Sequence, residues 1–407
     1  MKTVWRDAKA RRMLGAILMS SLGFGLNILA LGQVLFELTG STQAFVSVLA
    51  AQGIGAICVL PFCGPLVDAL RSTRVYVAAA AGKAACVLAI VGITAAGPAD
   101  PVPFVMAAAV LLAVCDNVER AALFKFTAHH IDRSAVVKFN AVNGMAFQAG
   151  VVIGMALLGV VLAFGSPAGA LLLSAGASAL CALVARGVRT EKPENTGPLS
   201  VALLRTALPG LFGDWRQMFR RYRKELVVFA MVVTCTADFL FANSMSTLVV
   251  PLVDRFYDRQ SWYISALEAT FGTGMITASF FTSRTAKQRL LPLWLGVQAA
   301  VALLLSSTGE PVFHFAAFLV AGFANLNSLV WLLASLQQHA GEGDKAKMAS
   351  LRLLAIGLGS VVLMPFVGRA AKVSLGTGYL SVAAIMLVFA LGSIWVAARF
   401  RPRATTG

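Results

Sequence analysis

The sequence predicts an all-α membrane protein with twelve transmembrane helices in two six-helix bundles, and three observations support this prediction. Apolar residues make up 58% of the 407 residues and charged residues 13%, a composition that excludes an ordinary soluble domain. Apolar stretches of about 20 residues or more, the length that a helix needs to cross a bilayer, alternate with short polar connections. Basic residues gather on alternate connections, which is the positive-inside pattern of a multi-pass protein.

The predicted spans lie six on each side of a long polar interruption. They are 12–38, 43–67, 75–96, 102–122, 136–163, 167–187, 226–250, 262–283, 289–308, 312–335, 347–372 and 376–399. The connections opposite to the basic ones carry only Arg255, Arg259, Arg369 and Lys372. We therefore expect both termini in the cytoplasm, and we attribute the net charge of +16 to membrane topology rather than to a nucleic-acid partner.

The polar interruption divides the sequence into three parts. Residues 1–187 form the predicted N-terminal six-helix bundle, residues 188–225 a cytoplasmic linker, and residues 226–407 the C-terminal six-helix bundle. The beginning of the linker predicts a flexible segment. Its later part, 200–224, has apolar residues at helical spacing opposite arginines, which predicts a helix on the membrane surface; a solvated basic linker is the alternative. Two six-span halves indicate a transporter with its site between two repeats.

Two acidic residues lie within predicted spans of the C-terminal half. Asp238 lies near the middle of the seventh span, and Glu268 lies in the outer part of the eighth. A charge at the centre of a membrane helix costs about 2.5–3.5 kcal/mol, so it needs a partner, an aqueous cavity or a function. We predict that Asp238 and Glu268 bind cargo or couple its transport to protons. The alternative for each is a polar contact between helices.

A second set of charged residues lies in the N-terminal half. Asp116, Glu119 and Arg120 are in the fourth span, where Asp116 and Arg120 share a helix face and can pair. Lys83 is in the third span, and its long side chain can extend toward the membrane surface. We expect the three residues of the fourth span to form a cytoplasmic gate, or a structural ion pair with Asp68 or Lys83.

Uncharged polar residues and one phenylalanine are candidates for lining the same transport cavity. Together with Lys83, they are Asn27, Gln33, Gln52, Asn143, Gln148, Asn243, Phe271, Asn325 and Asn327. Phe271 follows Glu268 in the eighth span, and an aromatic and acidic pocket suits amphiphilic or cationic cargo. The alternatives are ordinary interhelical hydrogen bonds and simple packing of a residue type that is common in membrane helices.

The sequence contains no constellation of catalytic residues. His129 and His130 are adjacent, without cysteines or spaced carboxylates, so they do not predict a metal site. No G-x-x-x-x-G-K-[ST] loop is present, and direct use of ATP is therefore not expected. We predict a protein that is not an enzyme and that has no cofactor and no metal.

A short segment after the second span resembles a family signature. The segment GPLVDALRSTRV contains Gly64, Asp68, Arg71 and Arg74, and it resembles the signature G-x-x-x-D-R-x-x-R-R-x of the major facilitator superfamily. Ala69 stands where the signature has its first arginine. The resemblance implies that Asp68 forms a charge-assisted latch between neighbouring helices, with Gly64 permitting close contact and Arg71 and Arg74 as cationic partners. The alternative is an ordinary loop carboxylate at the membrane surface.

Three further segments resemble one branch of that superfamily, which includes enterobactin exporters and macrolide-efflux proteins. The segments are ILALGQVLFELTGST (28–42), EATFGTG (268–274) and AKMASLRLLAIGLGS (346–360). The fifth span also carries Gly150, Gly154 and Gly159, a ladder of small residues typical of antiporters in the superfamily. Met155 replaces the proline that normally follows the central glycine. Glycines at such positions allow two helices to approach closely.

The branch resemblance implies a monomeric transporter in the cytoplasmic membrane of a bacterium. It would export a small amphiphilic molecule, a siderophore or a drug-like natural product, by alternating access, with the proton gradient as the energy source. The alternative is a lysophospholipid transporter or flippase of the same superfamily, in which a basic residue in the third span (here Lys83) and a lysine after the fourth (here Lys125) recur. A non-transporting membrane sensor is a remote third possibility, because the polar segments are short.

Overall fold

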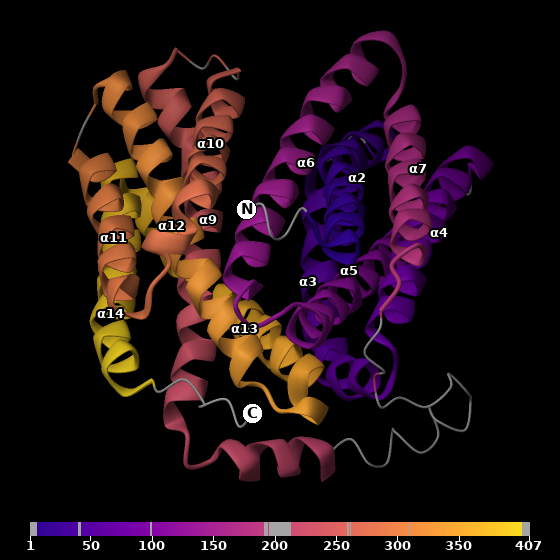
Figure 1. Ribbon diagram of the computed structural model, residues 1–407. Coiled ribbons are helices and arrows are strands. Elements are labelled where there is room, and N and C mark those ends of the chain that lie inside the picture. The colour runs from indigo at the N-terminus through magenta and orange to yellow at the C-terminus, as the bar shows by residue number, and fades with distance from the viewer. Residues whose placement is uncertain are drawn as a thin grey trace. The chain divides into compact units, whose positions relative to one another are not determined.

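The structure is a computed structural model, which describes residues 6–39, 42–97, 100–190, 194, 213–258, 260, 262–307 and 309–400. Long helices joined by short connections make up nearly all of these residues (Figure 1). The long helices of the first half are α2 (Ala8–Thr39), α3 (Thr42–Ala69), α4 (Ser72–Ala96), α5 (Val102–His130), α6 (Val136–Phe164) and α7 (Pro167–Arg186). Each of them contains one predicted span or nearly all of it.

The second half of the chain contains six further long helices within the described residues. They are α9 (Leu226–Phe256), α10 (Trp262–Thr285), α11 (Leu291–Ser307), α12 (Pro311–His339), α13 (Lys345–Val373) and α14 (Leu375–Arg399). Two short 3-10 helices, η1 (Gln288–Leu290) and η2 (Glu342–Asp344), precede α11 and α13. The all-α fold class predicted from the sequence is confirmed.

One of the twelve predicted spans is more polar than the others. Within the described residues, eleven helices are long and apolar enough to cross a membrane, and α10 is not among them. Helix α10 has 24 residues, which exceeds the length of about 20 that a span requires. It contains Glu268, Arg284 and many serines and threonines, and these polar groups dilute its apolar character.

Several helix ends lie where the sequence supplies capping residues. Ser374 precedes α14 and forms a reciprocal capping box with Thr377. The Ser166 hydroxyl accepts a hydrogen bond from the backbone N–H of Gly169 and so caps the start of α7. Gly97 follows α4 in the left-handed conformation, with φ of 58°, which glycine adopts without steric cost.

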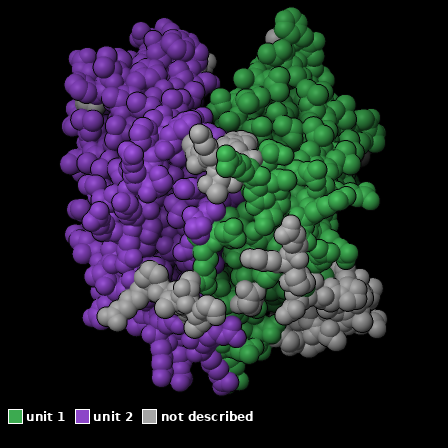
Figure 2. Space-filling view, viewed as in Figure 1, with its two compact units in different colours: residues 1–133, 146–219, 340–354 green, residues 134–145, 220–339, 355–407 purple. Residues whose placement is uncertain are grey.

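The chain forms two compact units, which Figure 2 shows in different colours. Unit 1 comprises residues 1–133, 146–219 and 340–354, and unit 2 comprises residues 134–145, 220–339 and 355–407. The first part of α6 therefore belongs to unit 2, and the first part of α13 belongs to unit 1. The division of the sequence into an N-terminal bundle, a linker and a C-terminal bundle stays a prediction.

The same helix pairings occur in both units. In unit 1 the contacts include α2 with α7, α3 with α5, α4 with α5, α4 with α7, and α2 with α3. The corresponding contacts in unit 2 are α9 with α14, α10 with α12, α11 with α12, α11 with α14, and α9 with α10. This recurrence supports the internal repeat, which the sequence indicates only through the number of spans and the position of the linker.

The apolar core of unit 1 lies mainly among α2, α4, α5 and α7. Buried side chains in it include Leu26 and Leu31 of α2, Ile90 of α4 and Leu171 of α7. The same helices expose large apolar side chains on other faces, including Leu88, Leu111, Leu173 and Leu183. A helix that is apolar all round is expected when one face meets the core and another meets lipid.

Glycines bring α2 and α6 into backbone contact within unit 1. A Cβ at Gly150 would lie 2.7 Å from the carbonyl oxygen of Leu18, and a Cβ at Gly154 would overlap the carbonyl oxygen of Leu22. Gly159, the third glycine of the predicted ladder, has no atom within 4 Å of such a Cβ. Two of the three ladder glycines therefore make the close approach that small residues permit.

The linker contains a helix over residues 213–222. The Trp215 indole N–H donates a hydrogen bond to the carbonyl oxygen of Pro61 in α3, at 2.8 Å, and the ring of Phe219 stacks on that of Trp215. Residues 200–212, the first part of the predicted surface helix, lie outside the described residues. The location of this helix on the membrane surface stays a prediction.

Candidate functional site

The carboxylate of Asp68, at the end of α3, caps the first turn of α13 within unit 1. Its Oδ1 accepts a hydrogen bond from the backbone N–H of Ala346 at 2.8 Å, and its Oδ2 accepts one from Lys347 at 2.9 Å. Such N–H groups have no partner inside their own helix and form the positive end of its dipole. Gly64 permits the approach, because a Cβ there would lie 2.7 Å from the Cα of Lys347.

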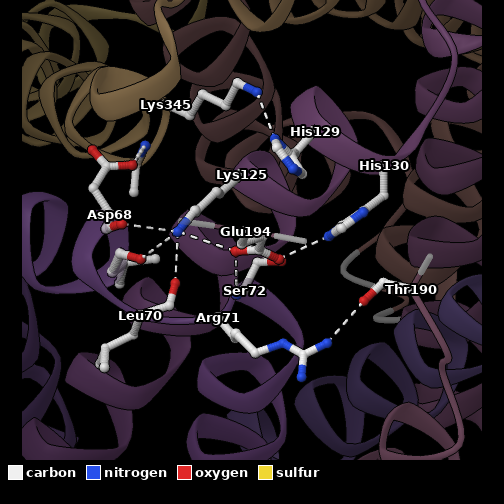
Figure 3. Close-up of polar contacts among 12 residues, drawn as sticks. Asp68, Leu70, Arg71, Ser72, Lys125, His129, His130, Thr190, Glu194 and Lys345 are labelled. Atoms are coloured by element: carbon white, nitrogen blue, oxygen red, sulfur yellow. Dashed lines mark hydrogen bonds and ion pairs between the residues drawn. The ribbon is translucent and has the colours of Figure 1, made fainter. Parts of the chain in front are cut away.

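The arginines expected beside Asp68 lie elsewhere. Arg71 donates a hydrogen bond to the hydroxyl of Thr190, at 3.2 Å (Figure 3), and Arg74 lies exposed on α4. A cation reaches this end of α3 from α5 instead, where Lys125 Nζ donates to the backbone carbonyl of Asp68 at 3.0 Å. Backbone N–H groups, rather than arginines, are thus the hydrogen-bond partners of the Asp68 carboxylate. The latch role of Asp68 stays a prediction.

Lys83 is the centre of a buried charge network in unit 1. Its Nζ lies 3.0 Å from Oε2 of Glu119 and 3.2 Å from Oδ1 of Asp116. The same ammonium donates a hydrogen bond to the Ser20 hydroxyl at 2.7 Å, and that hydroxyl donates to Oε1 of Glu119 at 2.6 Å. The side chains of Lys83 and Glu119 are 6% and 8% exposed. The network therefore joins α2, α4 and α5 by polar contacts inside the bundle.

Arg120 completes this network at its more exposed end. Its Nε lies 2.9 Å from Oδ2 of Asp116 in the i,i+4 arrangement that the sequence predicts. The guanidinium carbon lies 6.0 Å from the ring centre of Phe147 in α6. Two cations thus balance the carboxylates of Asp116 and Glu119. The expected ion pair with Lys83 is present, and a gating role for the three residues of α5 stays a prediction.

Asp238 lies in a buried cluster of neutral polar groups in unit 2. The residue is 1% exposed, and its Oδ1 accepts a hydrogen bond from the Gln298 amide of α11 at 3.0 Å. The Ser328 hydroxyl of α12 also donates to Oδ1, and the Asn325 amide donates to the Asp238 carbonyl oxygen at 2.8 Å. A carboxylate in a membrane-spanning helix is therefore held by uncharged donors from two neighbouring helices.

Glu268 has a different set of contacts in the same unit. The Ser246 side chain of α9 lies near the carboxyl group of this half-buried residue of α10. Phe271, expected to line the cavity beside it, is 7% exposed, and a Cβ at Gly322 of α12 would overlap its carbonyl oxygen. Phe271 thus lies where α10 and α12 pack closely, and its role in lining a cavity stays a prediction.

The remaining predicted cavity residues divide into two groups. The Gln52 amide donates to the carbonyl oxygen of Ala109 at 3.1 Å, and Asn327 accepts a hydrogen bond from the Thr285 hydroxyl. With Asn325, these residues fit the alternative of interhelical hydrogen bonds. The other residues are half-buried or exposed: Asn27, Gln33, Asn143, Gln148 and Asn243. Their role in a cavity stays a prediction.

Sequence reasoning missed three residues that form buried polar contacts, Gln298, Ser328 and Glu194. Gln298 and Ser328 are polar groups in the middle of predicted spans, and this signal was available because such groups need partners in an apolar medium. Glu194, which Figure 3 shows beside Lys125 and His130, was assigned to a flexible segment. Its partners are far from it in sequence, so the local sequence contains no sign of them.

Comparison with known proteins gives one family match. Residues 13–364 match the family model described as "Major Facilitator Superfamily". No curated protein matches the sequence.

Several solved structures share the fold over nearly the whole chain. A bacterial homologue of the iron transporter ferroportin, in its outward-facing state, has a TM-score of 0.79 at 12% identity, covering 97% of this chain and 100% of that one. The fucose:proton symporter of E. coli has a TM-score of 0.73 at 14% identity, covering 95% and 98%. The human organic anion transporter MFSD10 has a TM-score of 0.71 at 16% identity, covering 96% and 100%. At these identities the likeness shows the fold.

Proposed function

Because the chain belongs to the major facilitator superfamily, we propose that this membrane transporter is a proton-coupled exporter of a small amphiphilic molecule. The cargo class that we propose is a siderophore or a drug-like natural product, moved out of the cytoplasm of a bacterium by alternating access. The observation that carries the proposal is the burial of the Asp238 carboxylate, which accepts hydrogen bonds from Gln298 and Ser328.

Asp238 is the acid best suited to take up and release a proton. Ionised, it places a full negative charge in an apolar medium, and the Gln298 and Ser328 donors that contact it offset that cost only in part. A proton taken up during transport would remove this charge. Asp116 and Glu119 form ion pairs, Asp116 with Lys83 and Arg120 and Glu119 with Lys83. We assign coupling first to Asp238 and second to Glu268.

The comparison structures support proton coupling more than they support any cargo. One of them is described as a fucose:proton symporter, so the same fold serves proton-coupled transport elsewhere. The others are described as an organic anion transporter and as a homologue of an iron transporter. Because these descriptions name unrelated cargo, the proposed cargo class rests on the sequence resemblance described above, together with the half-buried acid Glu268.

Lysophospholipid transport is the alternative, and it depends on the basic residues Lys83 and Lys125. The structure engages Lys83 with Asp116 and Glu119, and it engages Lys125 with Glu194 and with backbone carbonyl groups. Both ammonium groups are thus already bound by other groups of the protein, so the two lysines do not indicate a site for a lipid headgroup. This observation favours the export proposal.

Untargeted mass spectrometry tests the proposal. Spent medium and cell extract are compared with and without the gene, in iron-poor and iron-rich growth. We expect a metabolite that decreases in the medium and accumulates in the cells when the gene is lost, and iron dependence would identify it as a siderophore. Unchanged metabolites, together with uptake of labelled lysophospholipid by spheroplasts only when the gene is present, would replace export by the lipid alternative.

A further inference from the structure

The linker residue Glu194 is buried at the end of unit 1 where α3 stops at Ala69 and α4 begins at Ser72. We call this region the α3–α4 end. The Glu194 side chain is 2% exposed, and the ion pair with Lys125 Nζ measures 3.1 Å (Figure 3). A buried carboxylate is costly unless donors surround it. The burial of Glu194 therefore indicates a specific binding site.

Each carboxylate oxygen of Glu194 has two partners in this site. The Ser72 hydroxyl donates to Oε1 at 2.6 Å, and Nε2 of His130 lies 2.7 Å from the same oxygen. The backbone N–H of Ser72 donates to Oε2 at 2.9 Å, and Lys125 pairs with that oxygen. Ser72, Lys125 and His130 are themselves 0%, 4% and 1% exposed. Buried donors thus surround both carboxylate oxygens of Glu194.

The site also provides a cap that α4 lacks locally. Arg71 occupies the N-cap position and makes no side-chain capping hydrogen bond. Glu194 supplies the carboxylate instead, at the end of the helix where the dipole favours a negative charge. The capping group comes from a position 122 residues later in the chain. The attachment of the linker and the capping of α4 therefore depend on the same contact, that between Glu194 and Ser72.

Lys125 connects this contact to the end of α3. Besides its ion pair with Glu194, its ammonium donates to the carbonyl oxygens of Val67 at 3.1 Å, Asp68 at 3.0 Å and Leu70 at 2.6 Å. A cation is favoured at the C-terminal end of a helix, where carbonyl groups have no partner within the helix. Lys125 and Glu194 together thus connect the end of α3, the start of α4 and the linker.

We propose that Ser72, Lys125 and His130 form a carboxylate-binding site whose ligand is Glu194 of the linker, and that this site fastens the linker to the α3–α4 end. The site is a receptor for the carboxylate group, so it accepts a small free carboxylate once the Glu194 side chain is removed. By holding the backbone of Asp68, it also positions the carboxylate that caps α13.

Limited proteolysis of the purified full-length protein tests the fastening. The bond after Arg189 is a trypsin site, and the Arg189 side chain is exposed. We expect E194A and E194Q to be cleaved there at least several-fold faster than the wild type, as followed by mass spectrometry of the Arg189–Thr190 bond. D132N, which removes an exposed carboxylate shortly after α5, serves as the matched control and should be cleaved at the wild-type rate. Wild-type rates for both Glu194 variants would overturn the proposal.

Chemical rescue with formate tests the receptor itself. Formate should raise the unfolding temperature of E194A above its value in chloride at equal ionic strength, because a ligand that binds the folded state stabilises it. The double variant E194A/K125M should not respond, and wild type should not respond because its own carboxylate fills the site. Formate should not slow the cleavage of E194A after Arg189, because formate fills the site but is not covalently attached to the linker. Equal responses of E194A and E194A/K125M would refute a carboxylate site.

Discussion

The carboxylate of Asp68 accepts a hydrogen bond from the backbone N–H of Lys347, a residue 279 positions later in the sequence. The geometry is that of a helix N-cap, but the capping side chain comes from another helix. Because Gly64 lies one turn before Asp68, the segment that resembles the family signature supplies both the cap and the space for it. Asp68 therefore acts on α13 through helix-end chemistry rather than through a pair with an arginine.

The first prediction concerns this cap. We expect D68A to lower the free energy of unfolding by about 1 kcal/mol, the typical loss when an N-cap side chain is removed. D68N should lose less, because its amide oxygen still accepts one N–H hydrogen bond. Thermal unfolding in detergent measures the difference, with D132N as the control for a lost exposed carboxylate. Equal stability of D68A and wild type would show that the cap contributes nothing.

The second prediction compares two glycines of the same helix. G154A should destabilise the protein by about 1–3 kcal/mol, because the added methyl group would overlap the Leu22 carbonyl oxygen and force α2 and α6 apart. G159A should be neutral or stabilising, since no atom lies within 4 Å of its new Cβ and alanine favours a helix. The unfolding temperature of G154A should therefore fall below that of wild type, while that of G159A should not; a G159A loss as large as that of G154A would contradict this account.

A feature could be predicted from the sequence where it depends on residues close together in the chain, and not where it depends on contacts between distant segments. Span positions were predictable because a membrane helix requires a long apolar run, and the i,i+4 pair of Asp116 and Arg120 was predictable because helix geometry fixes its spacing. Glu194 was not predictable, because its partners Ser72 and Lys125 are brought to it by the packing of other helices. The hydrogen bonds that Asp238 accepts from Gln298 and Ser328 likewise depend on the packing of α9 against α11 and α12.

The third prediction concerns the buried network around Lys83. K83M would leave Glu119, which is 8% exposed, without its cation, and we expect a loss of about 3–5 kcal/mol in the free energy of unfolding. The double variant K83M/E119Q should recover much of this loss, because it removes the uncompensated charge. Thermal unfolding of the two variants provides the comparison. A double variant no more stable than K83M would contradict this account.

The fourth prediction is the pH dependence of the Glu194 contact. Burial by itself would raise the pKa of Glu194, but the hydrogen bonds from His130 and Ser72 and the charge of Lys125 outweigh it and hold that pKa well below its usual range. A lowered folded-state pKa contributes stability that is fully present above the unfolded value, about 4.3, and is lost as pH falls below it.

The difference in unfolding temperature between wild type and E194Q should therefore not diminish from pH 8 to pH 5.5. The groups in contact with the carboxylate include Lys125 and His130, and the His129 ring lies beside the His130 ring. The difference should shrink below about pH 4.3. A difference that disappears between pH 8 and pH 6 would contradict the assigned direction of the shift.

The fifth prediction addresses coupling at Asp238. D238N is nearly isosteric, and its amide oxygen can still accept from Gln298 and Ser328, so the fold should be retained. Asparagine cannot ionise, and cargo movement should therefore lose its dependence on the proton gradient while cargo binding persists. Transport of the metabolite identified by mass spectrometry, measured in inverted membrane vesicles with and without a proton gradient, provides the readout. D132N is the control, and E268Q tests the second candidate. Transport by D238N that still follows the gradient would move the coupling role to Glu268 or to another residue.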